Sequence, residues 1–336
     1  MKAAVVLDAC CMEVQDLPTP TIRDDELLLK VCYCGICGSD LHLYKYCLFN
    51  PPAVLGHECA AEIVEVGKKV AGWNVGDKVL AHGGAACGVC ADCVSGASHL
   101  CLDAGHMGLG RRPGAYAEYL RAAPQMLIPL PADANLKVAT LAEPLSNAYR
   151  AAIRADVTPR DSALVLGAGP LGLSVVVCLR KLGVDTIVVS EPNPVRAAAA
   201  ARAGATIVVN PHEQNLREVI ENLPGGAPTV VFEIVGRREV IEEAFALTPA
   251  NGRTVLLGIC MESVQIVPVR WVVEEVSVIG SIGCDNEQFK ECADWIVHGE
   301  VDVEPLISHV IGIEEVPAMF ERLFHPTDEL KVLVGF

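Results

Sequence analysis

The stretch that decides the fold of this chain reads Ala163-Leu164-Val165-Leu166-Gly167-Ala168-Gly169-Pro170-Leu171-Gly172. Its apolar start predicts a short buried strand, and residues 170–182 predict a helix that Gly183 ends. Between them lies the pattern G-x-G-x-x-G, which in a strand–turn–helix context is the fingerprint of a dinucleotide site. The first glycine allows a tight turn, the second lets a pyrophosphate approach the backbone, and the third lets helix and strand pack closely. We expect the helix N-terminus to bind the phosphates through Gly167, Gly169, Pro170, Leu171 and Gly172.

The choice of dinucleotide depends on Glu191, which lies nineteen residues past Gly172 at the end of a predicted strand, residues 186–190. An acid in this position accepts hydrogen bonds from a ribose diol and repels a 2′-phosphate. Arg196 lies close by in sequence, and an arginine there can pair with that phosphate. The sequence therefore favours NAD over NADP and leaves NADP open.

The chain on the two sides of about residue 145 differs in its predicted secondary structure. From about residue 145, strands alternate with helices, which predicts a parallel sheet. Residues 1 to about 145 are β-rich, with short strands bounded by glycine and proline, as in a partly closed β-barrel. The tail has a helical run and then short strands, so we expect it to return to the first domain. The predicted domains are 1–146, 147–283 and 284–336.

Four cysteines, Cys87, Cys90, Cys93 and Cys101, are separated by two, two and seven residues. Four thiolates at such spacing can surround one tetrahedral zinc, with about 2.3 Å to each sulfur. A closed shell leaves no position for substrate. We therefore expect a structural zinc that holds a lobe at about residues 84–104.

A second set of candidate ligands is not closed. Cys37 and His57 lie twenty residues apart in the β-rich part, and Glu143 is a candidate third ligand. Two or three protein ligands plus water are the pattern of a catalytic zinc, because the substrate needs a vacant position. The sequence thus predicts two zinc ions per chain, one structural and one catalytic.

Composition limits the partners and the compartment. The chain has 336 residues, 51% hydrophobic and 20% charged, with a net charge of −16. This charge argues against nucleic acid or an anionic membrane as the main partner. No apolar run reaches the roughly 18 residues that a membrane span needs, and the N-terminus has the pattern of a strand rather than of a signal peptide. Fifteen cysteines without a secretory signal favour thiols and metal ligands in a reducing cytoplasm.

These motifs together resemble the zinc-dependent medium-chain dehydrogenases of the alcohol, polyol and threonine dehydrogenase group. The resemblance runs nearly end to end, over G-I-C-G-S-D-L-H, G-H-E, the four-cysteine lobe, E-P-L-S, the glycine fingerprint and the segment 303–309. It implies an α/β protein with a GroES-like β-barrel catalytic domain, a Rossmann doubly wound parallel-sheet domain, and an active site between them. It also implies a homotetramer or a homodimer.

By this resemblance, Cys37 and His57 would bind the catalytic zinc, and either Glu143 or Glu58 would be the third ligand while the other bonds the zinc-bound water. Ser39 would take the alcohol proton, His42 would pass it to solvent, and Ser281 would lie near the nicotinamide. The expected reaction is hydride transfer between NAD(H) and a secondary alcohol, such as a polyol or vicinal diol, giving the ketone. An amino alcohol, aminocyclitol or threonine-like substrate remains an alternative, as does a non-catalytic NAD- or zinc-binding module.

Overall fold

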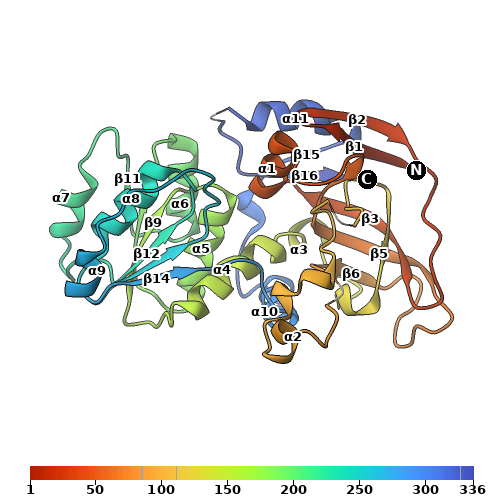
Figure 1. Ribbon diagram of the computed structural model, residues 1–336, viewed down its shortest axis with the longest axis horizontal. Helices are drawn as coiled ribbons and strands as arrows, with labels where there is room; N and C mark the ends of the chain where they lie inside the picture. Colours follow the sequence, from red (N-terminus) through yellow and green to blue (C-terminus); the bar gives the residue numbers. More distant parts are fainter. Residues whose placement is uncertain (85, 111, 326) are drawn as a thin grey trace. The chain divides into compact units, whose positions relative to one another are not determined.

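A computed structural model describes residues 1–84, 86–110, 112–325 and 327–336, and it divides into two compact units. The first unit contains residues 1–143, 284–299 and 307–336, and the second contains residues 144–283 and 300–306. Figure 1 shows both units coloured along the chain. The first unit has two sheets and the second has one, and each unit has its own buried core.

The second unit is built on a six-stranded parallel sheet in the order β11-β10-β9-β12-β13-β14. Its strands are β9 (Ser162–Leu166), β10 (Thr186–Ser190), β11 (Ile207–Val209), β12 (Val230–Glu233), β13 (Arg253–Leu256) and β14 (Ser277–Gly280). Most residues of β9, β10 and β12 are buried, and most are β-branched or leucine, as central strands covered on both faces require. The chain runs outward from β9 in both directions, so the site of a ligand is expected at the carboxyl ends beside β9 and β12.

Helices connect these strands and surround the sheet (Figure 1). They are α4 (Ala142–Arg154), α5 (Pro170–Lys181), α6 (Pro194–Ala203), α7 (Leu216–Glu221), α8 (Arg238–Leu247) and α9 (Val269–Val273). Right-handed crossovers place helices on opposite faces when the strand order reverses. Accordingly, α5 packs on β9 and α6, whereas α8 packs on β12 and β13.

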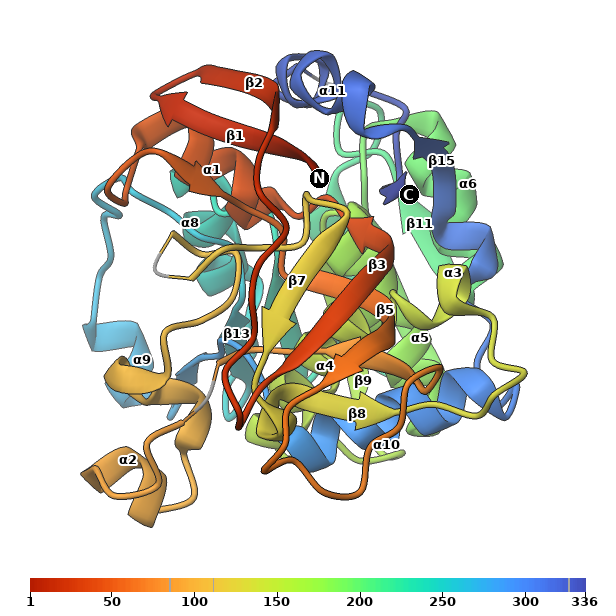
Figure 2. The same ribbon diagram turned by 90° about the vertical axis from the view of Figure 1, so that its right-hand side faces the viewer.

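The first unit contains a three-stranded sheet, β2-β1-β4, and a larger sheet along the path β15-β16-β3-β5-β6-β8, with β7 paired to β3. Figure 2 shows β7, β3 and β5 next to one another. The strands are β1 (Lys2–Asp8), β2 (Cys11–Asp16), β3 (Leu27–Gly35), β4 (Ala53–Val54), β5 (Glu58–Val66), β6 (Lys78–Ala81), β7 (Tyr119–Ala122), β8 (Leu127–Pro129), β15 (Ile307–Ile311) and β16 (Lys331–Gly335). The last strand of the chain, β16, thus pairs with β3 near its beginning.

The helices of the first unit are short, except for α10 (Asn286–Val297) with 12 residues. The others are α1 (Gly38–Tyr46), α2 (Ala91–Val94), α3 (Leu136–Ala139) and α11 (Val316–Leu323). Among the described residues, none of the helices is long and apolar enough to span a bilayer. The core of this unit joins strands from both ends of the chain, since Leu29, Ile63 and Val332 belong to one buried cluster.

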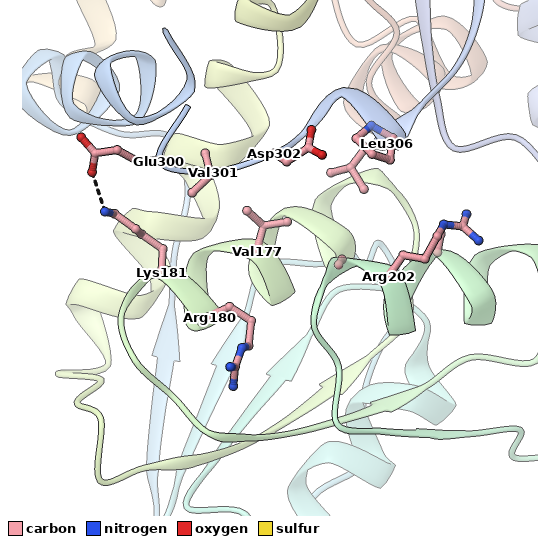
Figure 3. Close-up of a pocket in the computed structure, with 11 residues that line it drawn as sticks. Val177, Arg180, Lys181, Arg202, Glu300, Val301, Asp302 and Leu306 are labelled. Carbon is pink, nitrogen blue, oxygen red and sulfur yellow. Dashed lines mark hydrogen bonds and ion pairs between the residues drawn. The ribbon is translucent and has the colours of Figure 1, made fainter. Parts of the chain in front are cut away.

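Most of the tail, residues 284–299 and 307–336, belongs to the first unit, the domain to which we expected residues 284–336 to return. Residues 300–306 belong to the second unit, and the first boundary falls after Glu143 rather than after residue 146. Figure 3 shows the reason within the second unit: Lys181 at the end of α5 pairs with Glu300, and Val177 lies near Val301 and Leu306. The segment therefore lines a hollow of about 410 Å³ on the second unit.

Candidate metal centres and dinucleotide site

The four-cysteine lobe brings its sulfurs together as predicted from their spacing, although residue 85 within the predicted lobe lies outside the described part. The Sγ atoms of Cys87, Cys90, Cys93 and Cys101 all lie within 4.8 Å of one another. Zinc–sulfur bonds of about 2.3 Å place the corners of a tetrahedron roughly 3.8 Å apart. The Cys87 and Cys93 sulfurs are 3.9 Å apart, which fits one zinc ion.

Backbone groups in this lobe favour thiolates. The Cys90 N–H donates to Cys87 Sγ at 3.3 Å, and the Cys87 N–H donates to Cys101 Sγ at 3.4 Å. The backbone N–H groups of Val89 and Cys90 lower the pKa of Cys87 to about 7. Because the thiolate is the form that binds metal, this geometry suits zinc.

A second group of ligand atoms belongs to Cys37, His57 and Glu58, which also lie within 4.8 Å of one another. Cys37 is the N-cap of α1, and Glu58 is the first residue of β5. Gly56 directly precedes His57 and has a φ of +97°, so the chain turns there in a conformation that other residues rarely adopt. One soft, one borderline and one hard donor with no fourth protein ligand in the described group form an open site.

Asp40 orients this group. It is completely buried on α1, and its Oδ1 lies 3.2 Å from His57 Nδ1, while its Oδ2 accepts from Cys37 N–H at 3.0 Å and from the Tyr116 hydroxyl at 2.6 Å. Because Asp40 holds His57 Nδ1, the other ring nitrogen, Nε2, remains available to bind a metal. Burial lowers the pKa of His57, but Asp40 and Cys37 outweigh burial and raise it well above its usual value.

Lys331 is the main group that sequence reasoning missed. Its ammonium lies 2.6 and 2.8 Å from the two oxygens of Glu58, and the side chains are only 2% and 0% exposed. Burial lowers the pKa of Lys331, but Glu58 more than offsets this and raises it. A signal existed, because a lysine in the apolar run 330–334 is unusual for a buried strand.

The other predicted residues of the open site lie on α1 and α4. Ser39 Oγ is 3.4 Å from His57 Nε2, and His42 is half-buried three residues further along α1. Burial, and then Lys45, lowers the pKa of His42, which keeps its ring neutral and able to accept a proton. Glu143 is buried in the first turn of α4 and acts electrostatically on Lys331, but the described ligand group contains Glu58 and not Glu143.

The glycine fingerprint in the second unit has the backbone geometry that the three expected roles require. Gly167 has a φ of +99°, and a Cβ added at Gly172 would lie 2.1 Å from the Gly167 carbonyl oxygen. A Cβ added at Gly169, the N-cap of α5, would meet nothing within 4 Å. The turn is therefore tight, the helix and strand are close, and space remains where a pyrophosphate would approach. Pro170 and Leu171 begin the first turn of α5; since proline has no N–H, the free N–H groups there belong to Leu171 and Gly172.

Glu191 lies directly after β10 and is 5% exposed. One of its oxygens accepts from the Ala168 N–H at 2.7 Å and the other from the Asn193 N–H at 2.9 Å. A carboxylate offers about four lone-pair sites, so acceptor capacity remains for a ribose diol. Arg196 is half-buried in the first turn of α6, and Ser281 directly follows β14 with a buried hydroxyl that has no hydrogen-bond partner among the described atoms.

A parallel-sheet unit with a glycine fingerprint, together with one closed and one open group of metal ligands, is the combination found in zinc-dependent dehydrogenases. Comparisons with known proteins agree. Residues 23–132 match the family "Alcohol dehydrogenase GroES-like domain", and residues 170–298 match the family "Zinc-binding dehydrogenase".

Relatives cover almost the whole chain. Sorbitol dehydrogenase of Bacillus subtilis is 31% identical over 99% of this chain and 97% of the relative, and L-threonine 3-dehydrogenase of Bacillus velezensis is 30% identical over 92% and 91%. Among solved structures, 2R,3R-butanediol dehydrogenase of Bacillus subtilis has a TM-score of 0.90 at 29% identity, covering 100% of this chain and 99% of its own. A Sinorhizobium meliloti protein described as a zinc-binding dehydrogenase, solved with NADP, has a TM-score of 0.92 at 28% identity and the same coverage.

The chain belongs to the zinc-dependent medium-chain dehydrogenase family. The predicted fold class is confirmed: a GroES-like domain is joined to a Rossmann-like domain with a parallel sheet. The predicted class of enzyme, a zinc-dependent dehydrogenase, is likewise confirmed.

Proposed function

We propose that this enzyme interconverts a secondary alcohol, such as a polyol or a vicinal diol, and its ketone by hydride transfer with NAD(H). The observation that carries the proposal is the open group of Cys37, His57 and Glu58, in which a buried Asp40 fixes the histidine. Relatives that act on sorbitol and on butanediol support the substrate class. The dinucleotide is proposed to bind at the fingerprint of the second unit.

In the proposed mechanism the chain's own residues position groups and move a proton. Zinc, when bound, supplies Lewis-acid catalysis that lowers the pKa of an alcohol, and the nicotinamide, when bound, accepts the hydride. Asp40 holds the His57 ring so that Nε2 faces the ligand group. Ser39 receives the alcohol proton, and the neutral ring of His42 on the same helix passes it towards solvent.

The cofactors are proposed as two zinc ions per chain and NAD in preference to NADP. The two groups of ligands support the metal count. The position of Glu191 against the fingerprint loop supports NAD, since its carboxylate would face a 2′-phosphate at short range. The relative solved with NADP and the nearby Arg196 are the reasons to test both dinucleotides.

A threonine-like substrate or other amino alcohol is the second candidate, favoured by the similarity to L-threonine 3-dehydrogenases. A panel of polyols, diols, aminocyclitols and L-threonine with NAD or NADP, followed at the absorbance of reduced nicotinamide, separates the candidates. Turnover of polyols or diols above all others supports the proposal. If protein shown to hold both metals turned over none of the secondary alcohols, the result would instead favour a non-catalytic NAD- or zinc-binding module.

We expect Cys37→Ala to abolish turnover, by a factor of at least about 10³, while NAD still binds, because the open site loses its only thiolate and the fingerprint lies in the other unit. The measurements are turnover, NAD affinity by calorimetry and zinc per chain by elemental analysis. Cys260→Ala is a matched control, since that thiol lies outside both ligand groups. Full activity in Cys37→Ala would remove the metal assignment.

Assembly and location complete the proposal. We propose a homodimer or homotetramer, supported by exposed apolar residues on the second unit between residues 259 and 282. The cytoplasm is the proposed compartment. None of the fifteen cysteines, all of which lie in the described part of the chain, forms a disulfide, which fits a reducing environment.

A further inference from the structure

The buried pair of Lys331 and Glu58 adds a component to the metal centre that the motifs do not contain. Lys331 is the first residue of β16, and its ammonium has three acceptors: both oxygens of Glu58 and the Ile36 carbonyl oxygen at 3.0 Å. All three of its N–H groups can therefore be satisfied. A fully buried lysine with complete partners is costly to place, and either charge would be strongly destabilising without the other.

The carboxylate of Glu58 is confined on its other side as well. A Cβ added at Gly35 would lie 1.9 Å from Glu58 Oε2, so the carboxylate occupies space that only glycine leaves free. Gly35 and Glu58 face each other in the register of β3 and β5. The strand that carries Lys331 pairs with β3 at the same end, through Leu333 and Gly35. Three strands thus fix one carboxylate.

This fixed carboxylate is also part of the open ligand group with Cys37 and His57. A free carboxylate there would be able to offer both oxygens to a metal and so occupy the position that substrate needs. A carboxylate whose two oxygens already accept charge-assisted hydrogen bonds is a weaker and less mobile donor. The ion pair therefore limits how many coordination positions Glu58 can occupy on a metal, and so keeps a position free for substrate.

We propose that Lys331 is a positioning residue of the catalytic metal centre: by holding both oxygens of Glu58, it prevents that carboxylate from closing the coordination shell. This inference rests on the proposed function, because it presumes that a metal binds at Cys37 and His57. Lys331 lies outside the sequence motifs of the family. A purely structural role, in which the pair only joins β16 to β5, is the alternative that the test must separate.

The test replaces both zinc ions with Co²⁺, whose visible bands lose intensity as the coordination number rises. Spectra of Cys37→Ala give the contribution of the four-cysteine lobe, which is subtracted. In Lys331→Met we expect weaker bands from the open site and a 10- to 100-fold fall in kcat, the range typical of partners behind metal ligands. Lys331→Arg retains the charge and should keep bands close to those of the unaltered enzyme.

Two further variants make the outcome decisive. In the double variant Lys331→Met, Glu58→Gln, the carboxylate that Lys331 held is gone and cannot enter the coordination shell, so the bands should recover even if activity does not. Lys331→Gln is the replacement if the methionine variant does not fold. Lys78→Met is the control for loss of a partly buried lysine that donates to a carbonyl elsewhere in the same unit.

The outcomes separate the inference from the function on which it rests. Unchanged cobalt bands and unchanged kcat in folded Lys331→Met or Lys331→Gln would overturn the inference and leave the proposed function intact. Equal loss of bands in Lys331→Met and in the double variant would show a structural role and would also overturn it. Absence of any cobalt beyond the lobe in the unaltered chain would overturn the proposed function itself.

Discussion

Glu191, at the carboxyl end of β10, is the residue expected to select the dinucleotide. Its two oxygens are held by the N–H groups of Ala168 and Asn193, so the carboxylate cannot swing away to admit a phosphate without breaking both hydrogen bonds. Charge-assisted hydrogen bonds of this kind each contribute about 1.5–3 kcal/mol. The fingerprint loop and the acid are therefore fixed together as one binding element.

We expect Glu191→Ala to raise the KM for NAD about 10-fold or more and to leave or improve the KM for NADP, because the acceptor for the ribose diol and the repulsion of the 2′-phosphate are both lost. Steady-state kinetics with both dinucleotides measure this. Glu213→Ala, which removes an exposed acid further along the same unit, should change neither KM. An NAD preference unaltered by Glu191→Ala would show that other residues select the dinucleotide.

At the scale of elements, the four-cysteine lobe illustrates a segment whose order depends on metal more than on packing. Among its described residues α2 is the one α-helix, with four residues, and several large apolar side chains are exposed: Val89, Val94, Leu100 and Leu102. A segment with so little buried apolar surface has few contacts to hold it. The free energy of metal binding must then supply much of its stability.

We expect Cys93→Ser to remove one zinc per chain and to expose the lobe to limited proteolysis between residues 84 and 104, while the freshly prepared enzyme keeps most of its kcat. The physical reason is that the closed shell loses a ligand but the open group in the same unit is unaltered. Elemental analysis, cleavage mapping and initial rates measure the three effects. Cys260→Ser serves as control and should retain both metals. Normal zinc content with an intact lobe would contradict the prediction.

The elements that were well predicted from sequence are those set by local pattern. The helix at Pro170–Lys181 and the strand at Thr186–Ser190 agree closely with expectation, because an apolar run, a glycine turn and a terminating Gly183 are all local signals. The helix α7 is short, since the Asn215 side chain caps its start and it ends at Glu221. The strand β14 and helix α9 were not predicted, because their many exposed apolar residues do not follow a one-sided pattern.

For the candidate site, too, the parts set by local sequence spacing were predictable and the parts set by strand pairing were not. Spacing along the chain indicated both cysteine-containing groups, and the structure brings each group together. Spacing could not show that Glu58, rather than Glu143, lies with Cys37 and His57, since this depends on the pairing of β3 with β5. Nor could it show Lys331, which reaches the group only because the last strand of the chain pairs with β3.

At the scale of the whole molecule, the distribution of exposed apolar residues bears on assembly. Val267, Val269, Val272 and Val273 are 62–77% exposed, and they lie on or next to α9 in the second unit. The strand β14, which follows, is at the edge of the six-stranded sheet and has one paired neighbour, β13. An exposed edge next to apolar side chains favours association with another chain. Two copies of one chain can offer this surface to each other about a twofold axis.

We expect the double variant Val272→Glu, Val273→Glu to dissociate the proposed dimer or tetramer by at least one step, since two carboxylates on each copy would be buried without partners and would repel those of the other copy. Light scattering after size-exclusion chromatography gives the mass, and circular dichroism shows whether the sheet persists. Val75→Glu is the control, because this valine is 65% exposed and belongs to the first unit, whereas the edge strand belongs to the second. If the unaltered chain is an oligomer and the double variant keeps the same mass, assembly uses a different surface. A monomeric unaltered chain would instead show that the exposed valines need no partner of their own kind.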